Sequence, residues 1–188
     1  MQVTLSTTTD PNDIITLADI KSHLRITHDL EDGLLTGIRA AAINYVQNYA
    51  NVQLGSVTAY GYMPAFVASY IPIGPVTAIS AVEYETDNDG TLQTMPSADW
   101  HVDTRTRPAR ISFSDIPSPY EYAMMPIRVT MTVGHAEDAI PGVIIQAIKM
   151  LAAHLYENRQ DEVVGTITSR VKLGLDALLA GERFIYQP

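Results

Sequence analysis

The sequence predicts an α+β fold, in which a helical bundle carries an inserted small antiparallel β-sheet. Helical periodicity covers residues 16–56 and returns over residues 140–181. Between them, residues 57–136 consist of short β-rich segments separated by Pro and Gly. No repeat or long linker divides the chain, so we expect a single domain over residues 1–188, ending in a C-terminal arm at residues 182–188.

Residues 16–56 are predicted to form two helices. Thr16, with an acid at the third helical position, is typical of a helix start, and this short helix ends near Arg25. A longer helix begins near Asp29 and ends near Ala50, because apolar residues recur between them at helical spacing.

The longer helix contains two glycines, Gly33 and Gly37. Each costs the helix about 1 kcal/mol relative to alanine, which favours close packing against a neighbour at these positions. In this helix and in the later apolar one, seven residues are expected in the core or at a subunit interface: Leu34, Ile38, Tyr45, Ile144, Ile148, Leu151 and Leu155.

Residues 57–136 are predicted to be mainly strands. The expected strands are VTAYGYM, SYIPI, VTAISAVEYE, TLQTM, DWHVDT, ARISFS and IRVTMTV, whereas PSPYEYAMMP reads as a loop. Asp89 followed by Gly90 is the strongest hairpin signal. In IRVTMTV, residues 127–133, every second residue is apolar, which indicates an antiparallel strand with one buried face.

The most apolar helix is expected over residues 140–159, with Pro141 in its first turn. It has few polar positions, so most of its circumference should be buried in a core or a subunit contact. A last helix should run from about Arg170 to Ala180 and be closed by Gly181. No apolar run reaches the roughly 20 residues that span a bilayer, so we expect no membrane partner.

Composition excludes several classes of function. The chain has 188 residues, no cysteine and a formal net charge of −9, from 21 acidic against 12 basic residues. Disulfides and thiolate metal sites are therefore excluded, and no basic cluster could neutralise the phosphates of a nucleic acid. The absence of cysteine is compatible with synthesis in the cytosol.

Catalytic and metal-binding patterns are weak. His154 and Glu157 lie three residues apart on a helix, but two ligands do not make a metal site. Residues 87–90 faintly resemble a calcium loop, yet the position that needs a bidentate Glu is Ala98. Trp100 is best interpreted as a half-buried strand residue. We therefore expect no catalytic residue, no metal and no cofactor, and a protein that is not an enzyme.

Several motifs resemble the head–tail connector (adaptor) family of tailed phages. The opening matches the family's K-x-x-L-R, followed by an acidic pair and an alanine-rich helix, at Lys21, Leu24, Arg25, Glu31 and Asp32. The middle is similar at IPIGPVTAISAVEYETDNDGTLQTM, with an apolar-Gly-Pro-Val strand and a Gly-centred hairpin. The end is similar at MTVGHAEDAIPGVIIQAIKMLAAHLYENRQ and LDALLAGERF. These segments follow the family order along nearly the whole chain.

The resemblance implies a structural protein of the virion neck, made in the host cytoplasm. Members of this family form a ring, commonly of twelve copies, that docks beneath the portal protein and connects it to a stopper or tail-completion protein. DNA passes through the lumen of such a ring without specific binding. No catalytic activity is implied.

The C-terminal arm is the candidate portal-docking element. Arg183, Phe184, Ile185 and Tyr186 place three large apolar residues beside a basic one at a terminus, where chains are usually polar. The alternative is that this arm folds back onto its own bundle.

Two other functions stay open at this point. One is a different neck protein, such as a stopper or tail-completion factor, which would share the location and differ in its neighbours. The other is a small carbohydrate-binding module or hydrolase, with a binding face around Trp100, Tyr120 and Tyr122.

Overall fold

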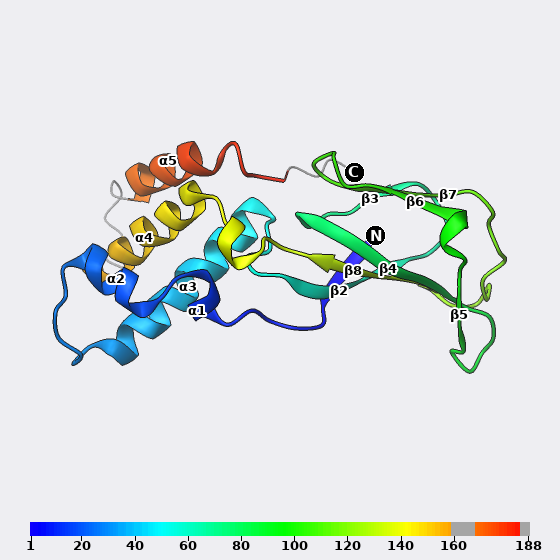
Figure 1. Cartoon of the computed structure of the whole chain (residues 1–188), viewed down its shortest axis with the longest axis horizontal. Helices are drawn as coiled ribbons and strands as arrows, with labels where there is room; N and C mark the ends of the chain where they lie inside the picture. The colour runs from blue at the N-terminus through cyan, green and yellow to red at the C-terminus, as the bar shows by residue number, and fades with distance from the viewer. Residues whose placement is uncertain (159–167, 185–188) are drawn as a thin grey trace. The chain divides into compact units, whose positions relative to one another are not determined.

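The α+β class is confirmed by a computed structural model, which describes residues 1–158 and 168–184. The chain divides into two compact units (Figure 1). The helical unit lies within residues 9–55 and 136–183. The sheet unit consists of residues 1–8 and 56–135, together with the chain end from Phe184. The boundaries fall where the sequence changes from helical to β-rich periodicity.

The helical unit contains five α-helices in its described part. They are α1 (Pro11–Ile14), α2 (Leu17–Leu24), α3 (Asp32–Ala50), α4 (Gly142–Glu157) and α5 (Thr168–Leu179), with a 3₁₀ turn, η2 (Glu137–Ala139), before α4. Helix α3 packs against α4, α2 contacts both of them, and α5 packs on α4. None of the described helices is long and apolar enough to cross a bilayer.

Local signals explain where these helices begin and end. The Thr16 hydroxyl oxygen accepts a hydrogen bond from the Asp19 amide at 3.1 Å, as the sequence predicts for the start of α2. Arg25 ends this helix in the left-handed conformation, with φ of 59°. The short α1 was not predicted from the sequence, although Asp10 caps it by accepting from the Asn12 amide at 2.8 Å.

The sheet unit holds two antiparallel sheets, whereas the sequence predicts one small sheet. The five-stranded sheet has the order β1 (Gln2–Leu5), β2 (Val57–Met63), β8 (Ile127–Val133), β4 (Val76–Glu85), β5 (Leu92–Thr94). The three-stranded sheet has the order β3 (Ser69–Tyr70), β7 (Arg110–Phe113), β6 (Trp100–Asp103), and the turn η1 (Ser97–Asp99) precedes β6. The expected single sheet is therefore wrong, because sequence periodicity marks strands but not how they pair.

Strand β8 is the centre of the larger sheet, paired with β2 on one side and β4 on the other. Its residues alternate between buried and half-buried, and Ile127, Val129, Met131 and Val133 are fully buried. This confirms the predicted buried face of residues 127–133.

The two sheets share one apolar core. Side chains from both sheets contribute to it, among them Val82, Ile111 and Met131. Phe66 lies between β2 and β3, in a stretch to which no element is assigned from the sequence. Its ring packs edge-on against Tyr84 of one sheet and Phe113 of the other, with centroid distances of 5.8 and 5.1 Å. The sheet unit is thus a small two-layer structure (Figure 1).

Candidate functional site

Helix α3 has two apolar faces, and only one of them is buried within the chain. The buried face consists of Leu35, Arg39, Ala42, Ile43, Val46 and Ala50. The second face is the α3 stripe, defined as Leu34, Gly37, Ile38, Ala41 and Tyr45, whose members recur at helical spacing. Leu34 and Tyr45 keep 40% and 45% of their surface exposed.

The seven residues expected in the core or at an interface therefore divide into two groups. Ile144, Ile148 and Leu151 of α4 are buried in the helical unit. Leu34 and Tyr45 are not core residues of this chain, and Ile38 and Leu155 are half-buried. Helical spacing selects a face but does not say what covers it, so the sequence could not separate the two groups.

The glycines of α3 lack the close neighbour that the sequence favours. A Cβ atom built at Gly33 or Gly37 meets no heavy atom within 4 Å among the described residues. The cost of about 1 kcal/mol per glycine in a helix is therefore not balanced by packing inside the described chain. A surface that combines Gly37 and Ala41 with two exposed large apolar residues is suited to a close approach by another helix or strand.

The start of α3 is fixed by the residues that carry the family resemblance. The Lys21 ammonium of α2 donates to Asp29 at 2.5 Å and to Asp32 at 2.8 Å. These bonds raise the pKa of Lys21, first through Asp29 and then through Asp32, and the bond from Lys21 lowers the pKa of Asp29. The neighbouring acid, Glu31, accepts a hydrogen bond from the Tyr156 hydroxyl of α4 at 2.5 Å. The acidic pair thus connects three helices.

The end of α3 is held by aromatic contacts. Tyr45 and Tyr49 stack with their ring centroids 6.1 Å apart. The Tyr49 hydroxyl donates to the Asp176 carboxylate of α5, which raises the pKa of Tyr49. The guanidinium of Arg183 lies 4.7 Å from the centroid of the Tyr49 ring. The contacts with Asp176 and Arg183 therefore hold Tyr49, and the exposed ring of Tyr45 stacks on Tyr49.

Phe184 of the C-terminal arm is buried, whereas a docking role for this arm would require the side chain to be exposed. This side chain is only 4% exposed, and a Cβ built at Gly74 would lie 2.3 Å from the Phe184 ring. Gly74 therefore leaves room for that ring, and the Arg107 guanidinium covers it at 5.5 Å from its centroid. Phe184 is an anchor in the sheet unit. Arg183 remains exposed, and Ile185 and Tyr186 lie outside the described residues.

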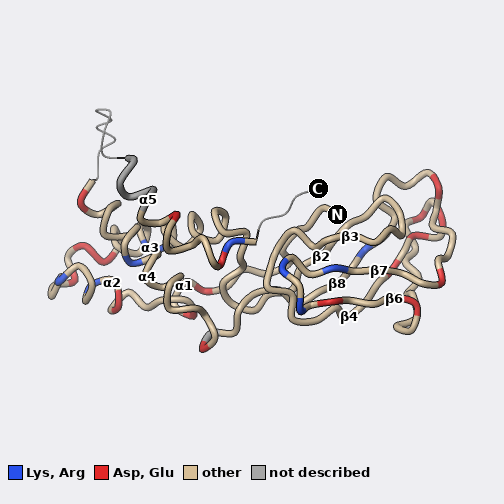
Figure 2. Tube along the Cα trace, turned by 90° about the horizontal axis from the view of Figure 1, so that it is seen from above, with Lys and Arg blue, Asp and Glu red and all other residues tan. Residues whose placement is uncertain are grey.

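Charge is unevenly distributed over the sheet unit. Acidic residues gather in the loops at the right-hand end of this unit in Figure 2, and basic residues lie along the strands nearer its other end. Three of its four basic residues are Arg105, Arg107 and Arg110, and the fourth, Arg128, pairs with Glu83 at 2.9 Å.

The residues of the catalytic and metal-binding sequence patterns lie in different elements of the structure. Within the described ranges, no group of three His, Asp or Glu side chains could hold a metal ion. His154 contacts Asn158 through its Nδ1 atom at 3.1 Å, at the exposed end of α4. Trp100 is half-buried and packs against the sheet core, as the sequence favours. Tyr120 and Tyr122 lie in the loop before β8, with ring centroids 5.5 Å apart.

Residues 14–92 match the family model of the phage gp6-like head-tail connector proteins. This segment contains Lys21 with its partners Asp29 and Asp32 (the Lys21 cluster), together with all of α3 and Gly74. The matched segment is less than half of the chain, and over it the chain is similar to the head–tail connector family. The opening motifs of the sequence resemble the same family. No curated protein sequence matches the chain.

Three solved structures share the fold of this chain over its whole length. A chain from the neck of an empty gene transfer agent (GTA) particle, computed with C6 symmetry, has 23% identity and a TM-score of 0.80. A chain from the neck of a native GTA particle, computed with C12 symmetry, has 21% identity and a TM-score of 0.78. A chain from the virion of a native GTA particle has 22% identity and a TM-score of 0.76. Each comparison covers 100% of this chain and 98% of the other.

The Lys21 cluster makes the helical unit sensitive to acid. Because the folded-state pKa of Asp29 is lowered, its contribution to the free energy of unfolding is present above the ordinary carboxyl pKa, about 4, and is lost as the pH falls through the folded-state value. We expect Asp29→Asn to lower the urea midpoint at pH 7 and to reduce the difference between the midpoints at pH 7 and pH 3. Asp115→Asn, at an exposed loop position, should keep the wild-type difference. Equal pH dependence in both variants would show that the cluster does not act in this way.

Proposed function

We propose that this chain is a connector, a structural subunit of the virion neck, which assembles as a ring beneath the portal protein and joins it to a stopper or tail-completion protein. The match of residues 14–92 to the head–tail connector family supports this role, and so does the shared fold with chains of GTA necks computed with C6 and C12 symmetry. Twelve copies are the expected number. Such a subunit acts through its contacts with neighbouring proteins, and no catalytic step is assigned to it.

The α3 stripe carries this proposal. Leu34 and Tyr45 are exposed on α3, and a Cβ built at Gly37 between them meets no heavy atom of the described residues within 4 Å. In a ring, each copy must present the same surface to a neighbour, so an apolar helix face with a small central residue fits a repeated contact. We assign the occupant of the α3 stripe as a second copy of this chain.

DNA is proposed to pass through the ring without binding. The formal net charge of −9 repels a polyanion, and the sheet unit contains only four basic residues, Arg105, Arg107, Arg110 and Arg128.

The ring is proposed to close on the portal and not in free solution. A curved contact of modest area must overcome the entropy of aligning each copy, and a preformed template removes much of that cost. The copy number is therefore best measured in assembled particles.

Substitution of Gly37 separates assembly from folding. Glutamine favours a helix more than glycine, so Gly37→Gln should raise the free energy of unfolding of the isolated chain by about 0.5–1 kcal/mol. The longer side chain should block the neighbour, so the number of connector copies per particle should fall at least tenfold, measured by quantitative mass spectrometry.

Gly142→Gln is the matched control, since Gly142 starts α4 and also has no atom within 4 Å of a built Cβ. It should leave the copy number unchanged. Normal incorporation of Gly37→Gln would exclude the α3 stripe from the ring contact.

The C-terminal arm is proposed to dock on the portal through Arg183 and the residues after the Phe184 anchor. A chain that ends at Phe184 should keep the wild-type free energy of unfolding but lose portal attachment, because it lacks Ile185 and Tyr186. Phe184→Ala should instead destabilise the sheet unit by about 3–5 kcal/mol, as expected for a buried ring. Attachment is measured by cosedimentation with portal-bearing capsids. Wild-type occupancy of the chain that ends at Phe184 would refute the docking role.

A further inference from the structure

The loop between β7 and β8 exposes large apolar side chains. We define the tip surface as Ile116, Tyr122, Met124 and Met125, together with the acidic residues Asp89 and Glu121. Tyr122 and Met124 are 77% and 90% exposed. Exposed apolar groups gathered on one loop typically mark a contact with another molecule.

The tip surface is held in place by the adjacent strand. The Tyr120 amide donates to the Glu85 carbonyl at 2.8 Å, and the Glu85 amide donates to the Pro126 carbonyl at 2.8 Å. Tyr122, Met124 and Met125 therefore lie in a segment that is hydrogen-bonded to β4 on both sides. Residues 86–99 and 114–125 contain no Lys or Arg, so the charge around these side chains is acidic.

A second exposed surface in the same unit has the opposite charge. We define the arginine surface as Val67, Tyr70, Arg105, Arg107 and Arg110. Val67 and Tyr70 are 54% and 44% exposed, and the Arg110 guanidinium lies 5.8 Å from the centroid of the Tyr70 ring. Asp103, which pairs with Arg105, is the one acid among residues 100–110. The arginine surface therefore combines apolar contact area with a net positive charge.

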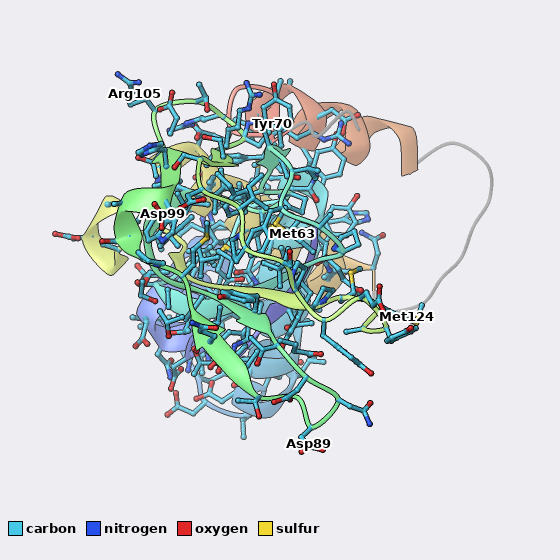
Figure 3. The ribbon with its side chains drawn as sticks, turned by 90° about the vertical axis from the view of Figure 1, so that its right-hand side faces the viewer. Met63, Tyr70, Asp89, Asp99, Arg105 and Met124 are labelled. Carbon is cyan, nitrogen blue, oxygen red and sulfur yellow. The ribbon has the colours of Figure 1, made fainter. Side chains whose placement is uncertain are left out.

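The two surfaces lie apart on the sheet unit. Figure 3 shows Asp89 and Met124 below Arg105 and Tyr70, and Figure 2 shows the acidic loops and the basic strands toward different ends of the unit. A head-to-tail contact between identical copies needs two different, complementary surfaces, placed so that neither blocks the other. The tip surface and the arginine surface meet this requirement in both charge and apolar character.

We propose that the tip surface of one copy docks on the arginine surface of the neighbouring copy in the ring. This contact is additional to the one through the α3 stripe, and it rests on the proposed ring. A second copy is favoured as the occupant because the complementary surface is present on the same chain. Apolar side chains at the centre supply contact area, and the acid–arginine pairs at the rim set the register of neighbouring copies.

Crosslinking in assembled particles tests the contact directly. The chain has no cysteine, so introduced thiols report only on the chosen positions. A chain with Met124→Cys and Val67→Cys, treated with a short bismaleimide, should give a ladder of covalent oligomers. Met124→Cys paired with Ala78→Cys, on an exposed position of β4, is the matched control and should give no ladder.

Every result of the crosslinking experiment either supports or overturns the proposed contact. A ladder from the first pair alone supports the contact. A ring seen by electron microscopy without that ladder overturns the inference and leaves the proposed function intact. A crosslink from Met124→Cys to a different neck protein also overturns it. Wild-type particles without a ring of this chain would overturn both.

Charge reversal provides an independent test. Asp89→Arg with Glu121→Arg should abolish ring formation, and so should Arg105→Glu with Arg110→Glu. A chain carrying all four changes should form rings again, because both surfaces have exchanged their charge. Asp138→Arg with Glu157→Arg, in the helical unit, is the control and should form rings as the wild type does. Failure of the fourfold variant, with each pair of changes still folded by circular dichroism, would overturn the inference.

Discussion

The packing of α3 against α4 is the constraint on which the rest of the structure depends. These helices flank residues 56–135 in the sequence, so their contact brings together the two ends of the whole β-rich segment. Burial of Ile144, Ile148 and Leu151 favours that closure against the entropy of a long loop. The Lys21 cluster and the Tyr156–Glu31 hydrogen bond then fix where α3 begins relative to α2 and α4.

This constraint also determines which surfaces are left for assembly. Because α3 uses one face inside the helical unit, its other apolar face remains available for a partner. The sheet unit is likewise closed around its own core and exposes apolar residues mainly in connecting segments, at the tip surface and the arginine surface. A subunit of the proposed ring would need such exposed apolar faces for its contacts with neighbouring subunits.

The sequence predicted those parts whose signals are local. The start of α2 at Thr16, the extents of β2, β4 and β8, and the buried face of β8 depend on caps and on alternation along a few residues. It could not identify the buried face of α3, since both faces of that helix are apolar. It also missed the contact between Gly74 and Phe184, because the two residues are far apart in the sequence and neither has a local signal for the other.

We propose that this chain works in a closed ring on the head–tail axis. A cryo-electron microscopy reconstruction of the neck of a particle that contains this chain tests it most directly. We expect the reconstruction to show a ring of identical copies, with the α3 stripe of each copy in contact with its neighbour. A neck that lacks the chain, or a ring in which every α3 stripe faces solvent, would contradict it.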